Sequence, residues 1–157
     1  FSSENAGPST LQVSGDTVHF SKEVAVSKLI EAYRARGHLL SDTNPIRERR
    51  RHKADLELQY FGLGDADLDV EFEAGHEIKI GKATLRQILE RLKQTYCSSI
   101  GAEYMHIRDE KIREWLQNAM EPIANKRAFD REEKRHILEK INQAVSFENF
   151  LGTAEKF

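Results

Sequence analysis

The clearest pattern of apolar and polar positions lies near the centre of the chain, between residues 82 and 97. Its apolar residues recur at intervals of three and four, which places them on one face of a helix: Leu85, Ile88, Leu89, Leu92 and Tyr96. Thr84 and Gln87 have the spacing of a capping box, in which each side chain binds a backbone N–H at the helix start. The pattern therefore predicts an amphipathic helix that begins after Thr84 and packs against a core.

Three further segments show the same helical spacing. The first is capped by Ser21 and carries Val26, Leu29, Ile30, Tyr33 and Gly37 or Leu40. The second is capped by Asp109 and carries Ile112, Trp115, Leu116, Ala119 and Met120. The third is capped by Asp130 and Glu133 and carries Ile137, Leu138, Ile141 and Val145. Residues 146–152 are then expected to form a separate short turn, which leaves Phe147 and Phe150 in need of a partner surface.

The segments between these helices predict the boundaries of the fold. Residues 1–20 are polar and aperiodic, so we expect a disordered lead-in, and residues 154–157 form a tail. Residues 54–83 have no sustained period and are expected to be an irregular loop. Within that loop a weak strand signal comes from alternating apolar and acidic residues: Leu68, Val70 and Phe72. The sequence thus predicts a mainly α fold, with one small helical domain over residues 21–153 and about four main helices.

Composition and charge exclude several classes of protein. The 157 residues carry a net charge of −2, whereas general nucleic-acid binding needs a broad basic surface. One basic cluster, Arg47–Lys53, is flanked by acids and contains no aromatic residue, so a solvated helix face is favoured over an anion or partner patch. The single cysteine, Cys97, excludes an internal disulfide and is expected to be a small buried residue. No apolar run is long enough to span a bilayer.

Two patterns are similar to metal-binding motifs. Residues 65–69 match the opening of a calcium loop, but Val70 and His76 replace the glycine and the bidentate glutamate that the loop needs. The spacing Glu-x-x-His, which di-metal helical bundles use, occurs three times: Glu73/His76, Glu103/His106 and Glu133/His136. Because only the second pair lies among apolar neighbours, a metal bundle is the weaker alternative.

Three long blocks of sequence remain after these motifs. They are Leu29–His38 followed by Thr43–Pro45, then Gln94–Ile107, and finally Glu133–Gly152. In their order and spacing they resemble the decarboxylating, thiamine-dependent component of 2-oxoglutarate dehydrogenase, over about residues 24–153. The resemblance identifies the helical region that precedes the catalytic core of that enzyme.

The resemblance implies an oxidoreductase of the tricarboxylic acid cycle that decarboxylates 2-oxoglutarate with thiamine diphosphate and Mg²⁺. The succinyl group then passes to a lipoyl group of the succinyltransferase component. Family members are usually homodimers with a transketolase-like α/β core. This chain lacks the family's cofactor signature, Gly-Asp-Gly followed by paired Asn, since residues 15–17 and 64–66 have the wrong third residue. We therefore expect an internal piece that is inactive alone, holds no cofactor, and docks on the core.

The resemblance also suggests which polar residues of this segment are directed toward the core. The candidates are Arg36, His38, Glu103, Tyr104 and His106, none of them catalytic, cofactor-binding or metal-binding. Each has a structural role as its alternative. A stand-alone helical module that binds a protein partner is the alternative function. The expected location is the cytoplasm of a bacterium or the mitochondrial matrix of a eukaryote.

Overall fold

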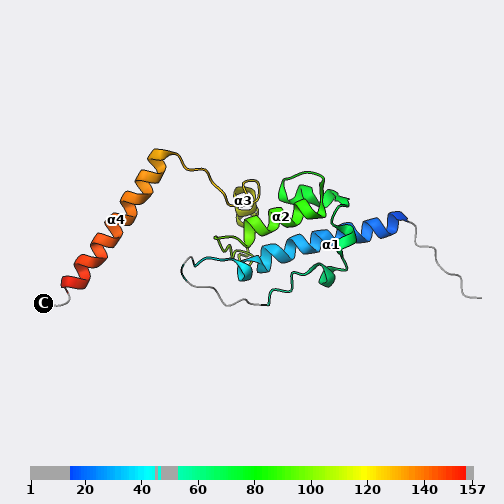
Figure 1. Cartoon of the computed structure of the whole chain (residues 1–157), viewed down its shortest axis with the longest axis horizontal. Coiled ribbons are helices and arrows are strands. Elements are labelled where there is room, and N and C mark those ends of the chain that lie inside the picture. Colours follow the sequence, from blue (N-terminus) through cyan, green and yellow to red (C-terminus); the bar gives the residue numbers. More distant parts are fainter. Residues whose placement is uncertain (1–14, 45, 47–52, 155–157) are drawn as a thin grey trace, which may run out of the picture. The chain divides into compact units, whose positions relative to one another are not determined.

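The computed structural model describes residues 15–44, 46 and 53–154, and its backbone is mainly helical, as predicted (Figure 1). Its α-helices are α1 (Gly15–Arg36), α2 (Leu85–Tyr96), α3 (Glu110–Met120) and α4 (Arg131–Ala154). Short 3₁₀ turns are η1 (Gly37–Leu40), η2 (Leu58–Phe61), η3 (Asp65–Asp67) and η4 (Glu73–Ile78). The chain forms two compact units, residues 1–125 and residues 126–157. The single domain predicted for residues 21–153 stays a prediction.

Helices α1 and α2 lie side by side and supply most of the core of the first unit. The predicted stripe of α2 is buried, with Leu85, Ile88 and Tyr96 at 0% exposure, and only Leu89 is partly buried. From α1 the core receives Val26, Leu29, Ile30 and Tyr33. The capping box of α2 forms as predicted, because the Gln87 N–H donates to Thr84 Oγ1 and the Thr84 N–H donates to Gln87 Oε1.

The irregular segment between α1 and α2 contributes more to the core than its sequence indicates. Its apolar residues Leu56, Leu63, Phe72 and Ile78 are all buried. The predicted strand is reduced to β1 (Glu71–Phe72), which pairs antiparallel with β2 (Ala83–Thr84). In the register Glu71 lies opposite Thr84 and Phe72 opposite Ala83. Successive 3₁₀ turns, rather than a regular period, bring these apolar residues to the core.

Two predicted helix boundaries are wrong. Helix α1 begins at Gly15, six residues before the predicted cap at Ser21, so residues 15–20 are helical rather than a disordered lead-in. Helix α4 runs without a break to Ala154, so the separate turn predicted for residues 146–152 does not form. The rest of the lead-in, most of the Arg47–Lys53 cluster and the end of the tail lie outside the described residues.

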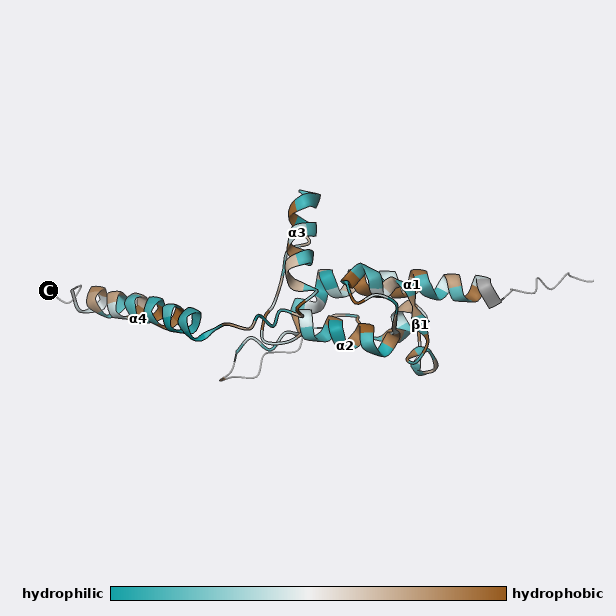
Figure 2. Ribbon diagram, turned by 90° about the horizontal axis from the view of Figure 1, so that it is seen from above, coloured by the Kyte–Doolittle hydropathy of each residue, from teal (hydrophilic) through white to brown (hydrophobic). Residues whose placement is uncertain are grey.

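The second unit consists of α4, which starts with a capping box. The Glu133 N–H donates to Asp130 Oδ1, and the Asp130 N–H donates to a Glu133 carboxylate oxygen. Its apolar side chains are exposed, and hydrophobic residues recur along the ribbon of α4 (Figure 2). Phe147 and Phe150 are 61% and 67% exposed.

Candidate functional site

A buried ion pair joins α1 to the C-terminal end of α3. The Arg34 side chain donates from Nε to Glu121 Oε1 at 2.7 Å and from a terminal nitrogen to Glu121 Oε2 at 3.0 Å. Arg34 is 6% exposed and Glu121 is 1% exposed. The remaining guanidinium N–H groups bind a carboxylate oxygen of Glu31 and the carbonyl of Glu77. This two-point geometry is the strong form of an arginine–carboxylate interaction.

Two tyrosines extend the ion pair into the core. The Tyr96 hydroxyl donates to Glu121 Oε1 at 2.6 Å, and the Tyr104 hydroxyl lies 3.1 Å from that of Tyr96. Because the one proton of Tyr96 goes to Glu121, Tyr104 donates in the second bond. The two rings are stacked, with centroids 6.4 Å apart. Arg34, Glu121, Tyr96 and Tyr104 form what we call the buried network.

The protonation states of the buried network are fixed by burial and by its own charges. Burial raises the pKa of Tyr96, and the charge and hydrogen bond of Glu121 raise it further. Burial alone would lower the pKa of Arg34, but the hydrogen bond to Glu121 and its charge outweigh it and raise the pKa. Both tyrosines therefore stay protonated and Arg34 stays charged, which suits a structural network rather than a proton-transfer site.

The turn that follows α3 is attached to α2 by three further contacts. Arg91 donates to the carbonyls of Glu121 and Pro122, and the Asn125 side chain donates to the carbonyl of Thr95 at 2.7 Å. Ala124 and Asn125 have positive φ angles of 50° and 53°, which such attachments hold in place. The end of α3 is therefore fixed relative to the core.

The five predicted site residues lie in different surroundings. Tyr104 is buried in the network. His38 Nε2 lies 3.9 Å from Glu103 Oε2, so η1 and the segment after α2 meet at this pair. Arg36 instead donates to the carbonyls of Ala54 and Asp55, and His106 is exposed. Their direction toward a catalytic core stays a prediction.

Arg34 and Glu121, the ionic centre of the network, are missing from the predicted site. Arg34 lies in the last turn of α1, where the helix dipole favours a cation, so its charge alone does not indicate a buried ion pair. Its position four residues after Ile30 already places it on the buried face of α1. That signal could have found Arg34, whereas Glu121 lies after the last apolar residue of α3 and has no comparable signal.

The metal-binding patterns are not assembled in the part of the chain that the structure describes. No group of three or more His, Cys, Asp or Glu residues there could hold a metal ion. Asp67, from the calcium-like segment, binds Lys22 and the Gly64 N–H instead. Burial raises the pKa of the half-buried Cys97 thiol to about 11, which makes it a poor nucleophile.

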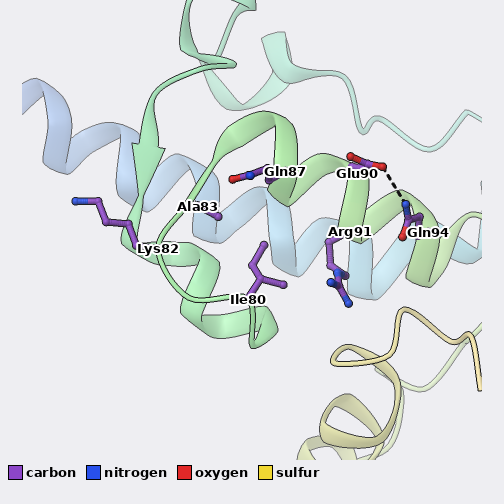
Figure 3. Close-up of a pocket in the computed structure, with 7 residues that line it drawn as sticks. All are labelled: Ile80, Lys82, Ala83, Gln87, Glu90, Arg91 and Gln94. Carbon is purple, nitrogen blue, oxygen red and sulfur yellow. Dashed lines mark hydrogen bonds between the residues drawn. The ribbon is translucent and has the colours of Figure 1, made fainter.

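A hollow of about 390 Å³ lies along the exposed side of α2 (Figure 3). Its lining is polar, but the polar groups already have partners in the fold. Lys82 lies 3.4 Å from Glu73, Gln94 donates to Glu90, and Arg91 holds the turn after α3. The hollow is therefore a groove between paired side chains, without convergent groups for a ligand.

The sequence of the chain is similar to segments of known proteins. No family model matches the chain. The chain is 43% identical to the 2-oxoglutarate dehydrogenase E1 component of Azotobacter vinelandii over 140 residues, which are 87% of this chain and 15% of the relative. The chain matches one segment of that enzyme. The family resemblance carried by the three sequence blocks is thereby confirmed.

Other relatives agree with this match. The 2-oxoglutarate dehydrogenase E1 component of Cupriavidus necator is 37% identical over 92% of the chain, and the mitochondrial 2-oxoglutarate dehydrogenase of Dictyostelium discoideum is 36% identical over 94%. The chain covers 15% of each of these two relatives. Among the described residues, no helix combines the length and apolar character needed to cross a membrane.

Proposed function

We propose that this chain is the helical region that precedes and supports the catalytic core of a 2-oxoglutarate dehydrogenase decarboxylating component. The observation that carries the proposal is the match at 36–43% identity over 87–94% of the chain. The complete polypeptide would release CO₂ from 2-oxoglutarate and pass succinyl to a lipoyl group. The segment itself supplies packing surfaces and is inactive alone.

The exposed apolar side chains of α4 support a docking role. An isolated helix gains little stability from its backbone alone, and most helices in proteins depend on a packed apolar face. On α4, Leu138 and Ile141 are 58% and 54% exposed, and toward the C-terminus Phe150 adds a ring that is 67% exposed. A surface of this kind favours burial against another part of the same enzyme.

The cofactor would be held outside this chain. Thiamine diphosphate with Mg²⁺ needs ligands for the metal and for the phosphates, and the described residues offer no group of carboxylates that could hold a metal. We therefore propose no step of the reaction on these residues. The wider proposal includes a homodimer that works with the succinyltransferase component, in the bacterial cytoplasm or the mitochondrial matrix.

The test is an assay of the complete polypeptide that contains this segment. We expect CO₂ release from 2-oxoglutarate that requires both thiamine diphosphate and Mg²⁺. A Phe150→Asp variant should lose activity or stability, whereas Tyr60→Asp, at a side chain that is 58% exposed on η2, should not. A polypeptide without this activity would contradict the proposal and favour the stand-alone interaction module.

A further inference from the structure

Helix α3 presents an apolar stripe to solvent. Ile112, Trp115 and Ala119 follow one another at i, i+3 and i+7, so they share one face of the helix. Trp115 is 67% exposed and Ile112 is 47% exposed, while the neighbouring Leu116 packs against the core. These three residues are called the α3 stripe. An exposed tryptophan on such a face is typical of an interaction site.

The described hydrogen bonds that attach α3 to α1 and α2 lie at its C-terminal end. None of its own residues is buried, yet the Glu121 that follows it belongs to the buried network. Arg91 and Asn125 fix the same end to α2. The C-terminal end of α3 is therefore fixed to the core although the helix itself adds little to it, which leaves the stripe available to a partner.

The charges around the stripe indicate the chemistry of that partner. On a 3.6-residue period Lys111 lies beside the stripe, next to Trp115, and Glu110 and Glu114 lie further round toward the opposite face. Arg113 lies on the side of α3 that faces the core, where it donates to the carbonyl of Ile107. A second copy of the same face would offer Lys111 another lysine rather than a carboxylate. An apolar surface bordered by carboxylates would fit.

We propose that the α3 stripe docks on an apolar, carboxylate-edged surface of the same polypeptide, beyond this chain. The chain covers about 15% of its relatives, so most of such a polypeptide is available to supply that surface. The inference rests on the proposed function, because it assumes that the partner surface belongs to the parent enzyme. It adds a second docking face, separate from that of α4, and assigns Trp115 as its anchor.

Hydroxyl-radical footprinting of the complete polypeptide tests this docking. Trp115 and Tyr60 have comparable exposure in this segment, 67% and 58%, and an indole reacts with the radical at least as readily as a phenol. Docking predicts that Trp115 is oxidised more slowly than Tyr60. Equal or faster oxidation of Trp115 would overturn the proposal. Protection that disappears on dilution to the monomer would assign the stripe to a second copy and also overturn it.

Variants of the complete polypeptide give a second readout. Trp115→Ala and Lys111→Glu should each speed hydrogen exchange of the α3 amides, Trp115→Phe should do so less, and Tyr60→Ala should leave them unchanged. Unchanged exchange in Trp115→Ala would contradict the docking. A polypeptide without 2-oxoglutarate decarboxylation but with Trp115 protected would refute the proposed function alone. An active enzyme with Trp115 exposed would refute only the docking.

Discussion

Removing the carboxylate of the buried network should destabilise the fold severely. In Glu121→Gln the side chain keeps its size, but Arg34, at 6% exposure, loses the charge that its two hydrogen bonds at 2.7 and 3.0 Å reach. Breaking a buried ion pair by removing one partner costs about 3–5 kcal/mol. The free energy of unfolding of a whole domain is about 5–15 kcal/mol, so this loss is a large part of its stability.

The assay is urea unfolding followed by circular dichroism at 222 nm. Replacing both charges, in Arg34→Met with Glu121→Met, should cost much less than the sum of the two single changes, since no buried charge is left unpaired. Asp69→Asn serves as the control, because the Asp69–Arg86 pair at 3.1 Å is exposed and should not matter measurably. A loss below about 1 kcal/mol in Glu121→Gln, the range of exposed pairs, would refute the reasoning.

Three further changes test other parts of the fold. Gly37→Ala should lower the free energy of unfolding by about 1–3 kcal/mol, because the new Cβ would lie 2.6 Å from the Cβ of Tyr96. Gly64→Ala is the control in the same unfolding assay, since a Cβ there has no neighbouring atom within 4 Å. Thr84→Ala should cost about 1 kcal/mol through the lost cap of α2, and an unchanged denaturation midpoint would contradict this. The hydrogen bond from Lys22 holds the pKa of Asp67 below its ordinary value. The pair therefore stabilises the fold above about pH 4 and loses this effect on acidification, so the stability difference from Asp67→Asn should shrink below that pH.

The regular helices could be predicted because their signals are local. The stripe of α2 and its capping box lie within one short segment, and both form as the spacing indicates. The start of α1 could not be predicted from Ser21, because the helix continues to Gly15 through residues that show no apolar period. The end of α4 could not be predicted either, because Phe147, Phe150 and Leu151 lie on a different face of the helix from the stripe before them.

The buried network could not be predicted because its members are distant in the sequence. Arg34 and Glu121 are 87 residues apart, and only the attachment of the C-terminal end of α3 to α1 and α2 brings them together. Tyr104 was singled out by its place in a family block, but its contact with Tyr96 depends on how the chain turns after α2. Glycine suits position 101 of that turn because a larger residue lacks room: a Cβ there would lie 2.8 Å from Ser41 Oγ. The φ angle of Gly101 is not positive.

The central claim is that this segment supports an enzyme whose cofactor site lies elsewhere in the polypeptide. Calorimetric titration with thiamine diphosphate and Mg²⁺, performed on the 157-residue chain and on the complete polypeptide, tests it most directly. The account predicts saturable binding by the complete polypeptide and none by the 157-residue chain. Saturable binding by the short chain, or no binding by the complete one, would contradict the account.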